Sequence, residues 1–319
     1  MSRMTMFVRR FVRRRLLTTL ALGVVLALTA VLVPDAEVAE PRAELIATKW
    51  AKGLDVAKFT RKGGTIWVLA VGSDARPGQK VTRTRGDALH LIGFNPSSGY
   101  ATDISIPRDS YVNIPGHGRD KINSALLYGG PKLMGRAVGN LVGVQPQYVF
   151  VTSFSGMSDM VIGVGGVDVD NPRAFSDPYV APYGFKKGRI HISGPHSVDF
   201  ARARKTLPGG DFDRSANQSR VIRAIHRKIV ARQYDIGFKA KGVSLVMKKM
   251  HTTGLSGRDL YQLANAVAAI NPGKVRTCVV PGGIGNAGAA SVVFPNVGAA
   301  RAMGKDARND GRLNRGCRG

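Results

Sequence analysis

The sequence contains little cysteine and few acidic residues, and it lacks several motifs that mark well-known enzyme classes. Because Cys278 and Cys317 are the only two cysteines, a disulfide-dense scaffold and a cysteine-rich zinc site are excluded. Two cysteines fit either one disulfide in an exported protein or a pair of free thiols, and we favour the disulfide.

The arrangement of histidines and glycines excludes further classes. The six histidines show no His-Glu-x-x-His spacing, so the sequence predicts no zincin-type metal centre. No Gly-x-Ser-x-Gly elbow and no Gly-x-x-x-x-Gly-Lys-Ser/Thr loop occur. A classical serine hydrolase and a P-loop nucleotide-binding protein are therefore disfavoured.

Basic residues far outnumber the acidic ones. The 319 residues include 47 Lys and Arg but 21 Asp and Glu, which gives a net charge of +26. Such an excess predicts an anionic partner: nucleic acid, an acidic membrane surface or a phosphate-bearing substrate. Part of the excess also fits a preference for arginine as a solubilising residue. The apolar content of 44% is ordinary for a globular protein and predicts a packed core.

The N-terminus has the pattern of a membrane anchor. Residues 9–15 contain five arginines, and residues 16–33 contain no charged side chain. A helix of that length reaches ~27 Å, close to the thickness of the hydrocarbon layer, and the positive charge before it orients the N-terminus to the cytoplasm. We predict a cytoplasmic tail over residues 1–15 and a signal anchor over residues 16–34, in a single-pass membrane protein with an extracytoplasmic C-terminal domain. A cleaved signal peptide is the alternative.

Strand and helix patterns alternate along the rest of the chain. Residues 35–62 are predicted to be a partly helical stalk, before a domain over residues 63–312 and a tail over residues 313–319. Apolar runs bounded by turn residues predict strands over 65–71, 88–94, 100–106, 148–152, 165–170, 276–280 and 291–294. Helical spacing predicts helices from 123 and over 132–142, 155–163, 215–232, 245–250 and 260–270, with residues 171–194 as a surface excursion. The predicted class is α/β, a mixed central sheet flanked by helices in an α-β-α sandwich, with an N-terminal transmembrane helix.

Charged residues gather at the ends of predicted strands, in segments 71–76, 83–87, 105–109 and 200–218. Ligands of α/β proteins bind where strand ends meet loops. Arginine pairs bidentately with phosphate, and several arginines aimed at one point need a highly charged anion between them. Interleaved aspartates favour Mg²⁺, which takes one or two protein carboxylates together with substrate phosphates. The pattern therefore predicts a pyrophosphate held between arginines and a cation.

Each charged residue also has an ordinary structural interpretation. Asp74 and Asp87 could each cap a turn. Arg202 and Arg204 are two residues apart, so on a strand they would share a face, which could be a solvated edge.

The motifs together resemble a known family. In chain order they read Gly72-Ser-Asp-Ala-Arg76, Arg85-Gly-Asp87, Ser105-Ile-Pro-Arg-Asp-Ser110, Lys121-Ile-Asn-Ser-Ala125, Tyr128-Gly-Gly-Pro131, Gly165-Gly-Val167, Phe200-Ala-Arg-Ala-Arg204 and Gly210-Asp-Phe-Asp-Arg214. This order, over residues 65–232, resembles the LytR-CpsA-Psr family of cell-wall enzymes. Two positions depart from the family pattern: Asn217 stands where an arginine is common, and Arg85-Gly-Asp-Ala88 stands where Arg-Ser-Asp-Thr is usual.

The resemblance implies a membrane-anchored phosphotransferase. Such enzymes move an anionic glycopolymer, such as wall teichoic acid or arabinogalactan, from a polyprenyl-pyrophosphate carrier to peptidoglycan through a phosphodiester bond, and could also cleave pyrophosphate. The implied metal ligands for Mg²⁺, with Mn²⁺ as the alternative, are Asp74 and Asp87. The implied catalytic residues are Arg108, Asp109 and Asp87, with the general base open between the two aspartates. The implied pyrophosphate-binding residues are Arg85, Arg108, Arg202, Arg204, Arg214 and Gln218.

Two other functions remain open at this point. A non-catalytic wall-polymer-binding or regulatory membrane protein would use the basic surface as a whole, and it would not depend on any single arginine. Nucleic-acid binding is suggested by charge alone, and we expect none because the domain is predicted to be extracytoplasmic. The expected partners are the prenyl-linked glycan, peptidoglycan and membrane lipid.

Overall fold

The computed structural model describes residues 42–51, 64–238, 242 and 249–314. The predicted anchor over residues 16–34 lies outside the described residues. Among the described residues, no helix has the length and apolar character needed to cross a bilayer. Cys278 is buried in the core, whereas Cys317 is not described, so the disulfide stays a prediction.

A seven-stranded mixed sheet forms the centre of the domain, in the order β12-β1-β7-β2-β3-β4-β13. These strands are β1 (Ala43–Ala47), β2 (Ile66–Ser73), β3 (Gly86–Asn95), β4 (Tyr100–Ser105), β7 (Tyr148–Ser153), β12 (Met250–Thr253) and β13 (Val275–Val279). Strand β3 runs antiparallel to both β2 and β4, whereas β2 is parallel to β7 and β4 is parallel to β13. The prediction of an α/β fold with a mixed sheet is confirmed.

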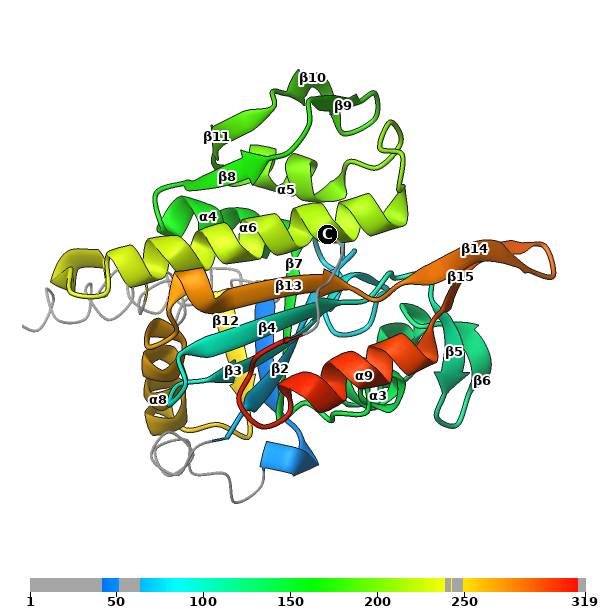
Figure 1. The fold of residues 1–319 in the computed structure, drawn as a ribbon, viewed down its shortest axis with the longest axis horizontal. Helices are drawn as coiled ribbons and strands as arrows, with labels where there is room; N and C mark the ends of the chain where they lie inside the picture. The colour runs from blue at the N-terminus through cyan, green and yellow to red at the C-terminus, as the bar shows by residue number, and fades with distance from the viewer. Residues whose placement is uncertain (1–41, 52–63, 239–241, 243–248, 315–319) are drawn as a thin grey trace, which may run out of the picture. The chain divides into compact units, whose positions relative to one another are not determined.

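Helices cover both faces of this sheet (Figure 1). They are α3 (Ser124–Val142), α4 (Phe154–Gly163), α5 (Gly194–Arg202), α6 (Asp211–Ala231), α8 (Gly257–Ala268) and α9 (Val297–Ala307), with short 3-10 turns at Lys49–Ala51 and Pro272–Lys274. Alternation along β2 explains the layering: Leu69 and Val71 pack with α3 and α9, whereas Ile66 and Val68 face α8. Helix α6 contacts β3, β4 and β13 on the same face as α8.

Four two-stranded sheets complete the domain, and one group of them forms a second layer above α6 (Figure 1). Their strands are β5 (Tyr111–Ile114) with β6 (Gly118–Lys121), β8 (Val167–Asn171) with β11 (Gly188–Ile192), β9 (Phe175–Asp177) with β10 (Ala181–Phe185), and β14 (Gly282–Ala287) with β15 (Ala290–Pro295). Phe175, Phe185 and Phe200 pack their rings together in the layer above α6, with ring centroids 5.1–5.4 Å apart. Residues 171–194, predicted as an irregular excursion, therefore contain three short strands with a core of their own.

The structure differs from the sequence prediction in four further places. Residues Ala43–Ala47 form a strand of the central sheet, where a helical stalk was predicted, because they pair with β7 and β12, which lie far away along the chain. Arg202 ends helix α5, so Arg202 and Arg204 do not share a strand face. Helix α6 begins at Asp211, earlier than predicted, after the chain turns at Gly210 with a φ of 53° that favours glycine. Of the predicted helix over 245–250, residues 245–248 are not described, and Met250 begins β12.

Candidate active site

The predicted acidic and basic segments meet at one edge of the sheet. Because β2, β3 and β4 are antiparallel neighbours, the end of β2, the start of β3 and the end of β4 lie side by side. The loop from β2 back to β3 is held at its neck by two hydrogen bonds. The Asp74 N–H donates to the Arg85 carbonyl at 3.1 Å, and the Arg85 N–H donates to Asp74 Oδ1 at 2.9 Å.

A cavity of about 190 Å³ lies at this edge, between the strand ends and the helices α5 and α6. Its lining residues are Asp87, Arg108, Phe154, Asp177, Tyr179, Val180, Arg202, Arg204, Lys205, Arg214 and Gln218. Six of the residues predicted from the sequence therefore converge here, namely Asp87, Arg108, Arg202, Arg204, Arg214 and Gln218. Asp74, Arg85 and Asp109 lie beside the cavity and do not line it. We refer to this cavity as the arginine pocket.

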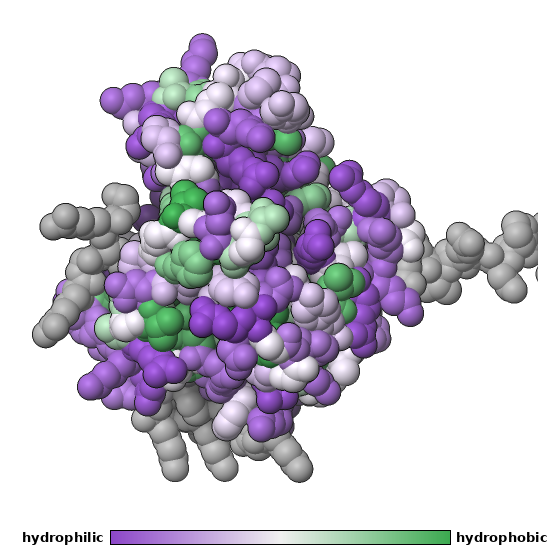
Figure 2. Space-filling view, turned by 90° about the vertical axis from the view of Figure 1, so that its right-hand side faces the viewer, coloured by the Kyte–Doolittle hydropathy of each residue, from purple (hydrophilic) through white to green (hydrophobic). Residues whose placement is uncertain are grey.

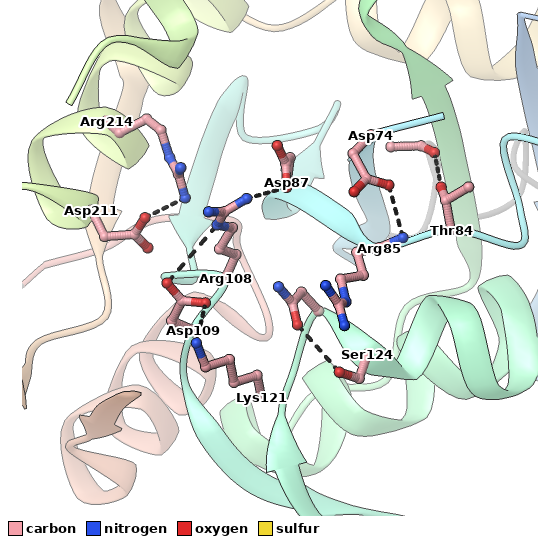
Figure 3. Close-up of polar contacts among 12 residues, drawn as sticks. Asp74, Thr84, Arg85, Asp87, Arg108, Asp109, Lys121, Ser124, Asp211 and Arg214 are labelled. Atoms are coloured by element: carbon pink, nitrogen blue, oxygen red, sulfur yellow. Dashed lines mark hydrogen bonds and ion pairs between the residues drawn. The ribbon is translucent and has the colours of Figure 1, made fainter. Parts of the chain in front are cut away.

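Arg108 is surrounded by carboxylates on the β3–β4 side of the arginine pocket (Figure 3). Its Nη1 donates to Asp87 Oδ1, and its Nε lies 3.9 Å from Asp109 Oδ2. Asp109 in turn lies 3.3 Å from Lys121 Nζ. Burial alone would lower the pKa of the Arg108 guanidinium, but the charges of Asp87 and Asp109 outweigh burial and raise it. This side of the pocket is thus neutralised by the protein itself.

Arg214 is the corresponding cation on the helical side, and its environment is the opposite. It is buried and pairs with Asp211 one turn earlier in α6 (Figure 3). Burial lowers the pKa of its guanidinium, Asp211 partly compensates, and the charges of Arg108 and Arg204 lower it further. Its Nε, like that of Arg108, has no hydrogen-bond partner among the described residues. The helical side therefore carries positive charge that the protein neutralises only in part.

Two more arginines reach the arginine pocket from the end of α5. The Arg202 guanidinium lies over the Phe154 ring, 4.4 Å from its centroid. The main chain at Arg204 and Lys205 is held by Asp177, whose Oδ2 accepts from both N–H groups at 2.9 and 3.0 Å. Hydrogen bonding from these N–H groups lowers the pKa of Asp177, although burial alone would raise it.

Gln218 connects the two sides of the pocket. It lies four residues after Arg214 and so shares a face of α6 with it. Its Nε2 donates to the Ala201 carbonyl at 3.2 Å and approaches the Asp87 carbonyl at 3.5 Å. Its Oε1 faces His90 Nε2 at 3.3 Å. Because both amide groups are engaged, Gln218 acts in this geometry mainly as a brace between β3, α5 and α6.

A buried polar network supports that brace, and the sequence did not predict it. His90 Nδ1 lies 3.0 Å from Asp103 Oδ1, and Ser219 Oγ donates to Asp103 Oδ2 at 2.6 Å. Both His90 and Asp103 are at most 2% exposed. The signal in the sequence was a histidine inside the mainly apolar strand β3 and an aspartate inside the neighbouring strand β4. Buried polar groups of this kind need partners, and here they supply them to one another.

Two carboxylates at this edge could hold a cation. Asp74 and Asp87 belong to the facing ends of β2 and β3, and carboxylate oxygens suit Mg²⁺. Within the described part of the chain, no group of three or more His, Cys, Asp or Glu is placed to hold a metal ion. Arg85 contributes its main chain to the neck of the loop, and its side chain lies near Ser124 in Figure 3. The residues therefore fit a cation that takes its remaining ligands from a substrate.

Comparison with known proteins decides the family. The model of the LytR_cpsA_psr family matches residues 38–308. The chain belongs to this family. The match includes β1, which the structure places in the central sheet, and every residue of the arginine pocket.

Named relatives in the LytR_cpsA_psr family include two transferases of similar sequence. The polyisoprenyl-teichoic acid–peptidoglycan teichoic acid transferase TagU of Bacillus mycoides (strain KBAB4) is 35% identical over 181 residues, 56% of this chain and 57% of that protein. TagU of Enterococcus faecalis (strain ATCC 700802 / V583) is 32% identical over 165 residues, 51% of this chain and 54% of that protein. The chain thus spans a little over half the length of these curated relatives.

Solved structures agree over more of the chain. Bacillus subtilis TagV superimposes with a TM-score of 0.61 at 25% identity, covering 75% of this chain and 93% of that one. TagT bound to LI-WTA superimposes with a TM-score of 0.61 at 26% identity, covering 79% of this chain and 91% of that one. The similarity therefore extends to the whole αβα arrangement that positions the arginine pocket.

Proposed function

We propose that this chain is a phosphotransferase that moves a glycopolymer from a polyprenyl-pyrophosphate carrier to peptidoglycan through a phosphodiester bond. The observation that carries the proposal is the charge of the arginine pocket. Its basic lining residues are Arg108, Arg202, Arg204, Lys205 and Arg214, whereas its acidic lining residues are Asp87 and Asp177. A pyrophosphate diester would supply the missing negative charge. The names of the TagU relatives and the complex of TagT with LI-WTA support the same substrate class.

The proposed reaction joins the acceptor to phosphorus and releases polyprenyl phosphate. An acceptor hydroxyl oxygen forms a bond to the sugar-proximal phosphorus, and the bond from that phosphorus to the bridging oxygen breaks. Polyprenyl phosphate leaves with the bonding electron pair, and the hydroxyl proton passes to a base. Charge develops on the phosphoryl oxygens and the leaving group, and preorganised arginines stabilise it. Arg214, Arg202 and Arg204 are the incompletely neutralised cations available for that role.

Asp109 and Asp87 are the candidate proton acceptors. Both carboxylates flank Arg108, so they would lie near a phosphoryl group that Arg108 binds. Asp87 is also the candidate ligand that would hold Mg²⁺, with Asp74 as its neighbour. A cation there would supply charge neutralisation at the phosphates, with Mn²⁺ as a substitute. A carboxylate bound to a cation is a poor base, so this assignment favours Asp109 as the acceptor of the proton.

The carried polymer and the location extend the proposal. The similarity to TagU favours a teichoic-type polymer, with arabinogalactan as the alternative that the sequence suggested. An anchor over residues 16–34 would place the pocket on the extracytoplasmic side of the cell membrane, where carrier lipid and peptidoglycan are both present. The need for an anionic partner is then met by the carrier phosphates and the polymer.

The test is a transfer assay with the full-length protein in detergent. Purified protein, a polyprenyl-pyrophosphate-linked saccharide and a peptidoglycan fragment are combined with Mg²⁺, and released polyprenyl phosphate and linked product are quantified. We expect transfer by the wild type, a large loss with Arg204→Ala, and unchanged transfer with the matched control Arg189→Ala on exposed strand β11. Chelation of the cation is expected to abolish transfer, and Mg²⁺ or Mn²⁺ to restore it.

The non-catalytic alternative gives the opposite result. A wall-polymer-binding protein that uses its charge as a whole would bind polymer equally well with Arg204→Ala and Arg189→Ala, because each removes one charge. It would release no polyprenyl phosphate. Equal behaviour of the two variants together with no release in the wild type would therefore reject the transferase.

A further inference from the structure

A second cavity begins at Tyr111, two residues after Asp109 along the chain. Its volume is about 360 Å³, and it is enclosed by β5, β6, β15, α3 and α9. We propose that this cavity is the subsite for the peptidoglycan acceptor, an inference that rests on the proposed function. We refer to it as the acceptor cavity.

The wall of the acceptor cavity is continuous with Asp109 through the main chain. The Val293 N–H donates to the Asp109 carbonyl at 2.9 Å, and Ser110 bridges to Val293. Tyr111 lies two residues after Asp109, so at ~3.3 Å per residue its Cα lies within about 7 Å of the Asp109 Cα. Phe294 directly follows Val293. A long glycan that leaves this cavity along the start of β5 would therefore pass close to the candidate base.

Aromatic rings form one wall of the acceptor cavity. Tyr111 and Phe294 meet edge to face, with ring centroids 6.1 Å apart and planes at 83°. Phe294 is 42% exposed, so its ring is open to a ligand in the cavity. The face of an aromatic ring carries partial negative charge and suits the C–H face of a sugar ring. This wall fits the glycan strand of peptidoglycan.

Polar residues around these rings match the other groups of peptidoglycan. The Arg119 guanidinium lies over the Tyr111 ring, 5.0 Å from its centroid, and Arg301 lines the cavity from α9. Arginine pairs with carboxylates, which the stem peptides of peptidoglycan carry. The side-chain amides of Asn113 and Asn140 also line the cavity and can pair with acetamido groups. None of the described residues that line this cavity is acidic.

The position of the acceptor cavity also suits the direction of attack. In phosphoryl transfer the attacking and leaving oxygens lie roughly in line, so acceptor and leaving group must approach from opposite sides of the phosphorus. Arg214 and Asp211 lie on one side of Arg108 in Figure 3, and Lys121 extends from β6, which also lines the acceptor cavity, towards Asp109. Carrier phosphates held by the helical arginines would leave the Asp109 side open to the hydroxyl.

A membrane surface is the competing occupant, and the surface argues against it. Figure 2 views the side on which β5, β6 and the β14–β15 hairpin lie, and hydrophilic and hydrophobic residues are interspersed over this face without a broad hydrophobic area. A lipid-facing surface would bury a continuous apolar face. A polar glycan with anionic peptides fits the mixed surface better.

The experiment separates acceptor binding from donor binding. Arg119→Ala and Tyr111→Ala are compared with Arg258→Ala and Tyr261→Ala, which alter the same residue types on α8, a helix that packs on the opposite face of the sheet. At saturating donor, the KM for a soluble peptidoglycan fragment is expected to rise at least ~tenfold in the first pair and to stay unchanged in the second. The Kd for the prenyl-pyrophosphate donor should change less than ~twofold in all four. Tyr111→Phe keeps the ring and should keep the wild-type KM.

Two outcomes would overturn the acceptor cavity. Either the KM for peptidoglycan stays unchanged in Arg119→Ala, or donor affinity falls together with it, in which case the cavity belongs to the donor. A third arm measures binding to anionic lipid vesicles, and a loss confined to vesicles would identify a membrane contact instead. If Tyr111→Ala fails to fold in a thermal unfolding assay, the exposed Arg119→Ala decides alone. A wild type that neither binds nor transfers donor would reject the proposed function itself, which is a separate result.

Discussion

The arginines on the two sides of the arginine pocket lie in different electrostatic environments. On the β3–β4 side, Arg108 is flanked by Asp87 and Asp109, and its pKa is raised although burial opposes this. On the helical side, burial, Arg108 and Arg204 together lower the pKa of Arg214 below its usual value, and only Asp211 is paired with it. Arg108 therefore has two carboxylate neighbours, whereas Arg214 is paired with one.

This difference indicates how a single pocket can bind a highly charged substrate and still fold without it. Gathering five cations around one point without carboxylates would destabilise the empty protein, because buried like charges repel. Pairing every arginine would leave nothing for the substrate. The chain does neither, since it neutralises the β3–β4 side and leaves the helical side partly uncompensated. The helical side is therefore where we expect the pyrophosphate to contribute most.

Removing the carboxylate that pairs with Arg214 should have the largest effect. Asp211→Asn leaves the Arg214 charge buried and unpaired, and breaking such a pair costs about 3–5 kcal/mol of unfolding free energy. Inorganic pyrophosphate should then raise the melting temperature of the variant more than that of the wild type, because the ligand replaces the lost anion. The control is Asp170→Asn, whose pair with Arg227 is exposed and contributes less than about 1 kcal/mol. Equal shifts with pyrophosphate in Asp211→Asn and the wild type would contradict an anion-binding helical side.

Removing the cation of the neutralised side should affect the reaction more than the fold. Arg108→Ala is expected to lower kcat by roughly 10²–10³-fold, since one preorganised donor at the phosphoryl group is lost. Arg108→Lys should recover part of the rate, because lysine keeps the charge without the bidentate geometry. Turnover at saturating donor is the measurement, with Arg189→Ala as the exposed control. A similar loss in Arg108→Lys and Arg108→Ala would show that geometry matters and charge alone does not.

The brace between the two sides gives a smaller effect. His90→Leu leaves Asp103 and Gln218 without their buried partner, which should cost about 1–3 kcal/mol of unfolding free energy. It should also weaken donor binding, since Gln218 holds the main chain at both Asp87 and Ala201. Asp103→Leu should cost a similar amount, and the double variant should cost less than the sum, because two apolar residues satisfy each other. Additive losses in a chemical denaturation series would argue against a coupled network.

The parts of this pocket that the sequence predicted are those defined by local patterns. Asp87 and Arg108 follow directly from strand patterns, because the ends of antiparallel neighbours must lie together. Residues 65–71, 88–94 and 100–106 are apolar runs bounded by turn residues, and β2, β3 and β4 appear within one or two residues of those bounds. Arg214 and Gln218 were predicted from the charged segment 200–218 and the family resemblance.

The remaining features depend on contacts between distant segments. Strand β1 has no strong local pattern and exists because Ala43–Ala47 pairs with β7 and β12. The His90–Asp103 contact needs the register of β3 on β4, in which Asp103 faces Ile92 and His90 faces Ser105. Residues 171–194 look like a loop because Pro, Gly and Tyr interrupt every run, yet three phenylalanines gather them into a small core. The periodicity of apolar residues along the sequence does not predict such contacts between distant segments.

The smallest expected effect is a loss of stability at acid pH, and it depends on Asp177 on the helical side of the pocket. N–H groups of Arg204, Lys205 and Tyr179 donate to Asp177 and lower its pKa, although burial alone would raise it. A carboxyl group whose pKa is lowered in the folded protein contributes stability that is present above its unfolded pKa of about 3.9 and is lost as the pH falls through its folded pKa. Between roughly pH 5 and pH 2, the wild type should therefore lose more unfolding free energy than Asp177→Asn does, as measured by chemical denaturation at each pH. At neutral pH the same variant should loosen Arg204, so donor Kd should rise while the Arg108 side stays intact. Identical acid profiles for the two proteins would show that Asp177 does not hold the helical side in place.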